Sequence, residues 1–321
     1  MTNEPRFLAL HELDATALRA EAAAGLGATP ATVSPKFLYD ALGSRLFDAI
    51  TELPEYYPTR IERAIFDAHA GAIAQAVLAC TGAASVIVDL GAGSCAKAAR
   101  LFGWLAPRRY VAVDIAVDHL RDALAALQRA YPGIEMVGVG QDFSRQLRLP
   151  ESVGAPRSLV FYPGSSIGNF APDDALRLLR DARAAAAGGA LLIGVDLAKP
   201  VPLLEAAYDD ALGVTAAFNL NVLRRLNALL GADFDVRQWR HVARFDASAS
   251  RIEMHLEARE AVAVRWPGAE RRFDAGERVV TEHSYKWTPE GFGALLHDAG
   301  FAAVRHWSDE QRWFAVFLAH S

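Results

Sequence analysis

Short apolar runs alternate with helix-length segments along the chain from about residue 60. Runs rich in β-branched residues and bounded by turn residues predict buried strands. The predicted strands are residues 85–90, 110–115, 135–139, 158–162 and 190–196. The predicted helices are residues 96–105, a long segment ending at Ala130, and residues 172–187 before the helix stop Gly188–Gly189. Strands separated by helices of this length predict a parallel sheet with right-handed crossovers.

The carboxyl-terminal segment changes this pattern. A predicted helix at residues 289–299 precedes strand-like runs at 301–307 and 313–319. The short connection at residues 309–312 can join only antiparallel neighbours. An α/β sheet that is parallel except for one antiparallel carboxyl-terminal strand is typical of the seven-stranded, Rossmann-like methyltransferase fold. The sheet of a dehydrogenase usually stays parallel.

Two stretches fall outside the alternation of strands and helices. Residues 10–59 precede the first predicted strand, and residues 200–285 interrupt the pattern with strand-like segments at 250–258 and 277–287. We interpret residues 10–59 and 200–285 together as a smaller α+β domain that binds the substrate. The remaining methyltransferase core, which is expected to bind the cofactor, comprises residues 60–199 and 286–321.

Composition narrows the classes of partner. The chain has 321 residues, 52% of them hydrophobic, and a formal net charge of -5, as in a soluble globular protein. Nucleic acid is not an expected partner, because phosphate binding requires a basic surface. Two cysteines, Cys80 and Cys95, are too few for a disulfide framework and fit a reducing cytoplasm. We recognise no secretory signal and no membrane-length apolar run, and we expect a cytoplasmic monomer with no membrane partner.

The histidines do not suggest a metal site. None of His241, His255, His283 and His306 has a second histidine at three- or four-residue spacing, and there is no Cys-x-x-Cys pair. No metal is therefore expected. Side chains alternate along a strand, so His283 should point away from the face of its neighbour Glu282.

A glycine turn follows the first predicted strand. Asp89, Gly91 and Gly93 lie at the carboxyl end of that strand, where doubly wound sheets bind their ligands. Glycine allows the backbone to approach a ligand that a Cβ would keep away. Asp114 ends the second strand, where a carboxylate can accept hydrogen bonds from both hydroxyls of a ribose. This combination fits an adenosine-containing cofactor.

The next strand supplies two further candidates. Asp142 can accept a hydrogen bond from an adenine amino group, and Phe143 provides an aromatic wall. Ala96 occupies the third position of the dinucleotide fingerprint, so the glycines alone leave a nicotinamide cofactor open. The antiparallel carboxyl-terminal strand favours S-adenosylmethionine. Lys97 is either a solvated surface lysine or a contact to the carboxylate of the cofactor.

Several segments match one family over nearly the whole chain, from about residue 33 to the end. The segments are Ser34-Pro-Lys-Phe-Leu-Tyr39, Leu53-Pro-Glu-Tyr-Tyr-Pro-Thr-Arg60, Gly164-Ser-Ser-Ile-Gly-Asn169, Ala207-Tyr-Asp-Asp210, Gly213-Val-Thr-Ala-Ala-Phe-Asn219, Arg251-Ile-Glu-Met254 and Thr281-Glu-His-Ser284. Together they resemble the L-histidine Nα-methyltransferases of ergothioneine biosynthesis. The second and fifth strings are the most specific, because they lie outside the generic methyltransferase core.

The resemblance implies a site for an amino acid. Asn169 and Tyr208 would bind the α-carboxylate of the substrate and orient its amine, without adding a nucleophile that competes for the methyl group. Tyr39 would lie near the amine, and Gly164 would belong to the substrate-binding loop. Positioning supplies much of the rate in such a displacement, since a well-oriented pair of reactants can be worth about 7–11 kcal/mol.

The resemblance also implies a pocket for the imidazole ring. Glu282 and Ser284 would bind the ring, and their spacing of two residues places both on the same face of a strand. Tyr56 would add a polar contact, and Met254 and Phe47 would pack around the substrate. The implied reaction is transfer of three methyl groups from S-adenosylmethionine to the α-nitrogen of L-histidine, which gives hercynine.

Three alternatives stay open at this point. The substrate could be another amino acid or an imidazole-containing amine, the protein could bind a nucleotide-like ligand without catalysis, or it could be a nicotinamide-dependent oxidoreductase. Two features depart from the family pattern. Cys95 lies next to the cofactor loop, where we expect a small buried side chain and not a nucleophile. The segment Tyr285-Lys-Trp287 is unusually aromatic and could alter the pocket wall.

Overall fold

The computed structural model describes residues 4–9 and 15–321 of the chain, which form two compact units. Within these residues, the large unit comprises residues 4–9, Pro58–Ala198 and Lys286–Ser321, and the small unit comprises residues 15–57 and Lys199–Tyr285. The junctions at Pro58, Lys199 and Lys286 lie within two residues of the expected positions 60, 200 and 286. Residues 10–14 of the expected smaller domain lie outside the described residues.

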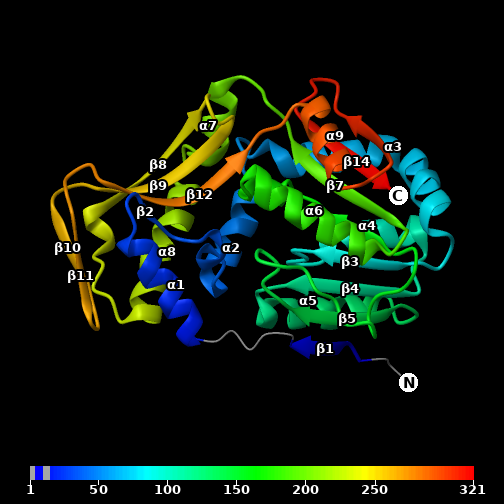
Figure 1. Ribbon diagram of the computed structural model, residues 1–321, viewed down its shortest axis with the longest axis horizontal. Helices are drawn as coiled ribbons and strands as arrows, with labels where there is room; N and C mark the ends of the chain where they lie inside the picture. The colour runs from blue at the N-terminus through cyan, green and yellow to red at the C-terminus, as the bar shows by residue number, and fades with distance from the viewer. Residues whose placement is uncertain (1–3, 10–14) are drawn as a thin grey trace. The chain divides into compact units, whose positions relative to one another are not determined.

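Within the described residues, the large unit is built around one sheet of eight strands (Figure 1). The strands are β1 (Arg6–Ala9), β3 (Val86–Leu90), β4 (Arg109–Asp114), β5 (Glu135–Gly140), β6 (Leu159–Tyr162), β7 (Ala190–Asp196), β13 (Ala303–Ser308) and β14 (Phe314–His320). Their spatial order is β1-β5-β4-β3-β6-β7-β14-β13. Strand β14 runs antiparallel to both of its neighbours, and the other pairs of neighbours in this sheet are parallel. The expected α/β sheet with an antiparallel carboxyl-terminal strand is therefore confirmed.

Strand β1 adds an eighth strand to the seven that the sequence predicts. It pairs in parallel with β5, from Arg6 opposite Val137 to Ala9 opposite Gly140. Phe7 occupies space that a side chain at Gly138 would need, because a Cβ there would lie 2.3 Å from the Phe7 ring. The glycine therefore permits the edge strand to pack closely.

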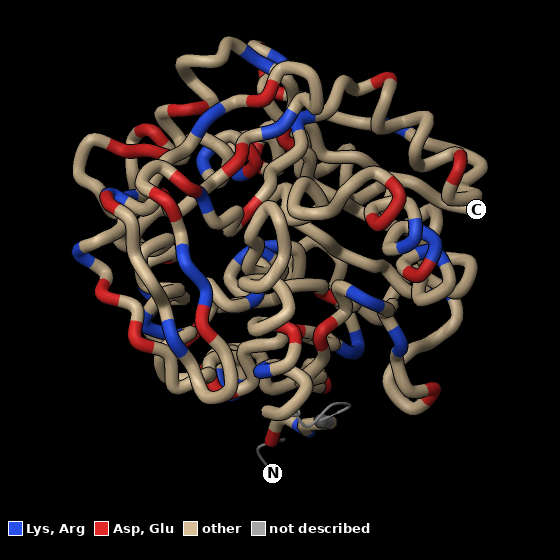
Figure 2. The backbone as a smooth tube through the Cα atoms, turned by 60° about the vertical axis from the view of Figure 1, so that its left-hand side comes forward, with Lys and Arg blue, Asp and Glu red and all other residues tan. Residues whose placement is uncertain are grey.

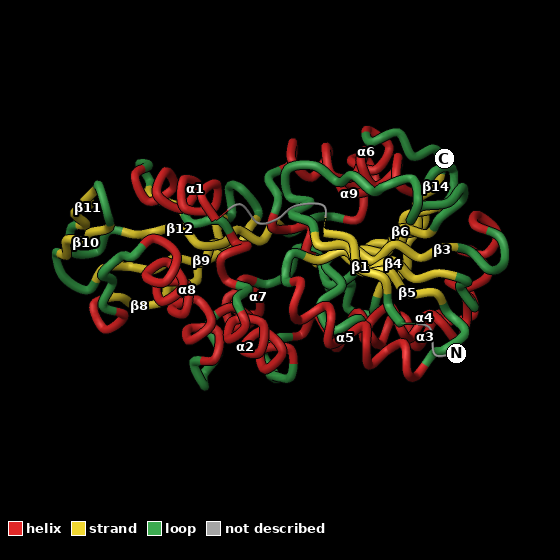
Figure 3. Tube along the Cα trace, turned by 90° about the horizontal axis from the view of Figure 1, so that it is seen from below, coloured by secondary structure: helices red, strands yellow, loops and turns green. Residues whose placement is uncertain are grey.

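Helices cover both faces of this sheet. They are α3 (Tyr57–Thr81), α4 (Ala96–Leu105), α5 (Val117–Ala130), the 3-10 helix η2 (Ser166–Asn169), α6 (Pro172–Ala186) and α9 (Pro289–Asp298). Figure 3 shows α6 and α9 on one face and α3, α4 and α5 on the other. Val88 belongs to the same buried cluster as Phe292 of α9, whereas its neighbour Ile87 belongs to the cluster that contains Ile73 of α3. Successive strand residues thus fill two separate cores, which is why these strands are apolar on both faces.

Helix α3 is a long element that the sequence pattern left unassigned. By length and composition alone it could cross a membrane, a test that buried helices of soluble proteins also pass. Its residues Ile65, Phe66, Ile73 and Val77 belong to the core under the sheet. The apolar character of α3 is therefore used in packing against the strands.

Helix α9 is capped at its amino terminus by Thr288, and removing this cap should change the free energy of unfolding of the protein. The Thr288 hydroxyl accepts a hydrogen bond from the Gly291 amide at 3.0 Å. Replacing Thr288 with alanine is expected to lower the free energy of unfolding by about 1 kcal/mol, because that amide loses its partner. Urea unfolding followed by circular dichroism measures the change. Thr288→Ser keeps the hydroxyl and is the control; an equal loss in the serine variant would contradict the capping explanation.

The small unit contains a four-stranded sheet with the order β2-β12-β9-β8 and a separate hairpin. Its elements are α1 (Ala15–Gly27), β2 (Ala31–Thr32), the 3-10 helix η1 (Pro35–Leu38), α2 (Ala41–Thr51), α7 (Val201–Tyr208), α8 (Val214–Leu230), the 3-10 helix η3 (Val236–Gln238), β8 (Trp239–Asp246), β9 (Arg251–Ala258), β10 (Val262–Trp266), β11 (Ala269–Phe273) and β12 (Arg278–Tyr285). Helices α7 and α8 pack against β8 and β9, and α1 and α2 pack against α8. The two strands predicted in this region appear as β9 and β12.

One face of the four-stranded sheet carries a network of charged side chains. Glu253 on β9 pairs with Arg251 at 2.6 Å, with Arg244 at 2.9 Å and with His255 at 3.1 Å. Burial raises the pKa of Glu253, but the hydrogen bonds from the two arginines outweigh it and lower the value to about 2. Along the whole backbone, too, acidic and basic positions are interspersed, as Figure 2 shows. These charges neutralise one another, so the face is not a strongly basic surface.

Candidate active site

The glycine turn after β3 lies where the strand order reverses, between β4 and β6. Gly91 and Gly93 both have positive φ, of 67° and 49°. The Gly91 amide donates a hydrogen bond to the Val113 carbonyl at 2.9 Å, which ties the turn to β4. A Cβ at Gly93 would have no heavy atom within 4 Å, and one at Gly91 would reach only the rings of Phe143 and Tyr162. The turn therefore leaves open space for a ligand beside its backbone.

Asp114 at the end of β4 is held in a fixed orientation. Its Oδ2 accepts a hydrogen bond from the Gly93 amide and its Oδ1 accepts one from the Ala116 amide, both at 2.8 Å. A carboxylate has about four acceptor sites, so two hydroxyl donors can still be accommodated. The side chain is half-buried, and the structure brings it directly against the glycine turn.

Asp89 is more deeply buried than a ligand contact would require. Its side chain is 1% exposed, and its Oδ2 accepts a hydrogen bond from the Tyr110 hydroxyl at 2.7 Å. Burial raises the pKa of Asp89 to about 7, although the Tyr110 hydrogen bond acts in the opposite direction. Cys95 is also buried, and burial raises the pKa of its thiol to about 12. The buried position of Cys95 agrees with the expectation of a small buried side chain.

The residues after β5 lie beside the same turn. Asp142 accepts hydrogen bonds from the amide and the hydroxyl of Ser144. The Phe143 ring stands edge-on to the ring of Tyr162, with centroids 5.9 Å apart. A Cβ at Gly91 would lie 3.9 Å from the Phe143 ring. The structure thus brings the predicted aromatic wall to the glycine turn.

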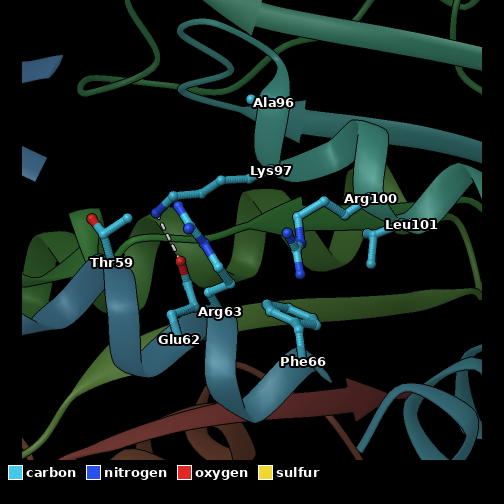
Figure 4. A pocket seen from close by; sticks show the side chains of 8 residues that line it. All are labelled: Thr59, Glu62, Arg63, Phe66, Ala96, Lys97, Arg100 and Leu101. Carbon is cyan, nitrogen blue, oxygen red and sulfur yellow. Dashed lines mark hydrogen bonds and ion pairs between the residues drawn. The ribbon is translucent and has the colours of Figure 1, made fainter. Parts of the chain in front are cut away.

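Lys97 does not stand alone on the surface. Its ammonium lies 2.7 Å from Oε2 of Glu62 on α3, as Figure 4 shows with a dashed line. The Glu62 side chain is 2% exposed and that of Lys97 is 40% exposed. The pocket around this pair is lined by Thr59, Glu62, Arg63, Phe66, Ala96, Lys97, Arg100 and Leu101. Glu62 lies just beyond one of the family strings and carries no spacing signal of its own, so the sequence did not point to it.

Asn169 ends the short loop and helix that follow β6. The loop turns at Gly164 and Ser165, which both have positive φ, of 79° and 59°. A buried hydrogen bond ties this loop to the end of β7, because the Ser165 Oγ accepts a hydrogen bond from the Asp196 amide at 2.8 Å. The half-buried Asn169 amide makes no side-chain hydrogen bond within the described part of the chain. Its donor and acceptor therefore remain available for a ligand.

In the small unit, the structure brings Tyr208 and Ser284 together. The Tyr208 hydroxyl and the Ser284 Oγ form a hydrogen bond of 2.8 Å, and both residues are buried. His241 supports Tyr208 from behind, because its Nε2 lies 2.8 Å from the Tyr208 carbonyl oxygen. The other ring nitrogen of His241 lies 2.9 Å from Nδ2 of Asn219. His241 was weighed from the sequence only as a metal ligand, and these two contacts were not predicted.

Glu282 lies directly opposite Met254 in the pairing of β12 with β9. Both residues are nearly buried, with 8% and 2% exposure. Residues paired across antiparallel strands share a face, and Ser284 is two residues further on, so all three lie on one face. A bulge precedes Glu282 at Thr281, whose hydroxyl donates to the Met254 carbonyl. His283 points to the other face, toward Glu253, as predicted.

Aromatic rings connect the remaining predicted residues of the small unit. Tyr39 contacts Phe47 and Phe218 with ring centroids 5.6 and 5.5 Å apart. Tyr56 lies between Phe47 and Tyr208, at 6.1 and 6.4 Å. Phe218 was not singled out from the sequence, although it belongs to a family string. The cluster holds Tyr39 and Tyr56 in the same group of rings as Tyr208.

The aromatic segment after Ser284 begins with a residue that does not share the face of Glu282 and Ser284. Tyr285 lies on the opposite face of β12, where its hydroxyl is 2.7 Å from Nη1 of Arg251. Lys286, already in the large unit, forms a buried ion pair with Asp196 at 2.9 Å. The described residues contain no group of three or more His, Cys, Asp or Glu side chains that could hold a metal ion.

A doubly wound sheet with an antiparallel β14, a glycine turn and an acidic residue at the end of the next strand defines an S-adenosylmethionine-dependent methyltransferase. Residues 18–321 match the family model of the histidine-specific, S-adenosylmethionine-dependent methyltransferases, and the chain belongs to this family.

Curated relatives agree with this assignment. The chain is 42% identical to the histidine N-alpha-methyltransferase of Mycolicibacterium smegmatis, over 95% of both chains. It is also 42% identical to the histidine N-alpha-methyltransferase of Mycobacterium tuberculosis, over 94% of both chains. Ergothioneine biosynthesis protein 1 of Schizosaccharomyces pombe is 28% identical over 83% of this chain, which spans 36% of that longer protein.

Proposed function

We propose that this protein transfers methyl groups from S-adenosylmethionine to the α-amine of L-histidine, three times in succession, to give hercynine as a step toward ergothioneine. The names of the mycobacterial and yeast relatives support the substrate and the pathway. The observation that carries the proposal is the buried face of the small unit on which Glu282, Ser284 and Tyr208 meet. A cytoplasmic monomer is part of the same proposal.

The large unit offers a suitable site for the methyl donor. S-adenosylmethionine supplies an electrophilic methyl group on a sulfonium. The open backbone of the glycine turn and the fixed carboxylate of Asp114 suit its adenosine, with Asp114 accepting the ribose hydroxyls. Asp142 and Phe143 would bind the adenine, and Lys97 would contact the cofactor carboxylate. Asp89 is buried directly before the glycine turn and would support the turn without contacting the cofactor.

The small unit offers groups that suit histidine. Glu282 accepts the imidazole N–H, and Ser284 donates or accepts at the ring while it stays hydrogen-bonded to Tyr208. A nearly buried carboxylate that accepts a hydrogen bond from the ring favours histidine over amino acids that lack a ring N–H. Tyr56 adds a polar contact, and Met254 packs against the ring.

Orientation of the amine completes the mechanism. The family resemblance implies that Tyr208 and Asn169 bind the α-carboxylate, which would fix the direction of the nitrogen lone pair as in-line displacement at the methyl carbon requires. Gly164 begins the loop that presents Asn169. Tyr39, held by Phe47 and Phe218, lies near the amine and hydrogen-bonds to it until methyl groups replace its protons.

Mass spectrometry of the protein incubated with S-adenosylmethionine and a mixture of the twenty amino acids tests the proposal. The expected result is a histidine-derived product that carries three additional methyl groups. Methylation of a different amino acid would retain the cofactor and reject the imidazole pocket. Binding of S-adenosylmethionine without methylation of any amino acid would reject free amino acids as substrates.

Replacing Asp114 with asparagine is expected to raise the dissociation constant of S-adenosylhomocysteine about tenfold, because an amide accepts fewer hydrogen bonds than a carboxylate. Isothermal titration measures the constant. Asp118→Asn makes the same charge change at an exposed position in the first turn of α5 and serves as the control. An equal effect of both substitutions would mean that net charge, and not the ribose contact, sets the affinity.

A further inference from the structure

Glu62 is a buried carboxylate whose two oxygens both have partners on other elements of the large unit. Its Oε2 pairs with the Lys97 ammonium at 2.7 Å, and its Oε1 accepts a hydrogen bond from the Gly164 amide at 2.7 Å. An ionised carboxylate that is 2% exposed is stable only when it is paired and hydrogen-bonded. Glu62 therefore joins α3 to the start of α4 and to the loop after β6.

The surrounding backbone leaves room for this carboxylate. A Cβ at Gly194 on β7 would lie 2.0 Å from the Glu62 Oε1, and one at Gly164 would lie 2.8 Å from the Lys97 Nζ. Gly164 also has a positive φ of 79°, which disfavours other residues. Glycines at these two positions, on different elements, thus leave room for the carboxylate and its partner as they are placed here.

The two partners of Glu62 belong to different parts of the proposed reaction. Lys97 is the proposed contact to the carboxylate of S-adenosylmethionine, and Gly164 begins the loop that ends at Asn169. We propose that Glu62 is a positioning residue, which holds the Lys97 ammonium where the aminocarboxylate end of the cofactor binds and anchors the loop that presents Asn169. The proposal rests on the cofactor part of the proposed function. Glu62 itself touches no reacting atom.

Glu62→Gln separates these two roles, because an amide has one acceptor oxygen for two donors. The Gly164 N–H is a backbone group held in the loop, whereas the Lys97 side chain is 40% exposed, so its ammonium can be hydrated instead. The glutamine oxygen should therefore remain with Gly164, and the hold on Lys97 should be lost. Glu62→Ala removes both interactions.

The test compares two ligands that differ only at the end that Lys97 is proposed to bind. S-adenosylhomocysteine carries the aminocarboxylate, and methylthioadenosine lacks it. Glu62→Gln is expected to raise the dissociation constant of S-adenosylhomocysteine about tenfold and to leave that of methylthioadenosine within twofold. In a Lys97→Met background, Glu62→Gln should cause no further loss. Glu62→Ala should in addition lower kcat for histidine, because the Asn169 loop is released.

The second ion pair between α3 and α4 supplies a matched control. Asp67 and Arg100 pair at the surface, with side chains 56% and 41% exposed. Asp67→Asn should change neither dissociation constant. An equal loss of affinity for both ligands in Glu62→Gln, or no loss for either, would overturn the positioning role. If the ligand-specific loss appears while the unmodified protein does not methylate histidine, the positioning role stands and the proposed substrate fails.

Discussion

Replacing Glu282 with alanine is expected to lower kcat/KM for histidine about 10³-fold. Glu282 is nearly buried opposite Met254 and accepts a hydrogen bond from the imidazole N–H in the proposed complex. Without Glu282, that N–H would be left without a hydrogen-bond acceptor in a site with little access to water. Truncating one partner of a buried, charge-assisted hydrogen bond typically costs about 2–5 kcal/mol in binding. Steady-state kinetics with histidine as the varied substrate, at saturating S-adenosylmethionine, measures this loss.

Two variants of β12 refine the Glu282 experiment. Glu282→Gln retains an acceptor oxygen and should lose less activity than Glu282→Ala. His283→Ala alters the next residue, which faces Glu253 on the opposite side of the sheet, and should leave kcat/KM within a few-fold. Affinity for S-adenosylhomocysteine should be unchanged in all three. A Glu282→Ala variant that keeps full activity toward histidine would show that another group recognises the ring.

Much of the large unit was predictable because its strands are buried on both faces. The runs that contain Ile87 and Val88 fill two cores at once, so they appear in the sequence as continuous apolar segments between helices. Strand β1 was not predictable, since its four residues pair only with the edge of β5 and depend on the absence of a side chain at Gly138. Helix α3 was missed because it lies outside the strand and helix alternation.

The candidate site was predictable only in part, for a related physical reason. Residues at strand ends, such as Asp114, are placed by the fold itself. Glu282 and Ser284 could be assigned to one face from their spacing, and the family strings supplied their roles. Glu62 and His241 act through tertiary contacts with Lys97 and Tyr208. No local pattern encodes such contacts, because the partners are far apart in the sequence.

Replacing Asn169 with alanine is expected to lower kcat/KM for histidine about 10²-fold, because the amine loses part of its orientation toward the methyl group. The Asn169 amide makes no side-chain hydrogen bond within the described part of the chain, so its removal leaves no internal donor or acceptor unpaired. Stability and affinity for S-adenosylhomocysteine should therefore stay unchanged. Kinetics, thermal unfolding and titration of the same preparation measure the three quantities.

Ser166→Ala, at an exposed position in the same 3-10 helix, is the control and should leave all three quantities unchanged. The pattern of losses then decides what Asn169 does. A loss confined to kcat/KM for histidine is the signature of a group that binds and orients the substrate. A parallel loss of cofactor affinity would instead mean that Asn169 shapes the loop that begins at Gly164, which is anchored by Glu62. The comparison with Glu62→Ala then separates orientation of the substrate from placement of the loop, since only Glu62→Ala should weaken S-adenosylhomocysteine as well.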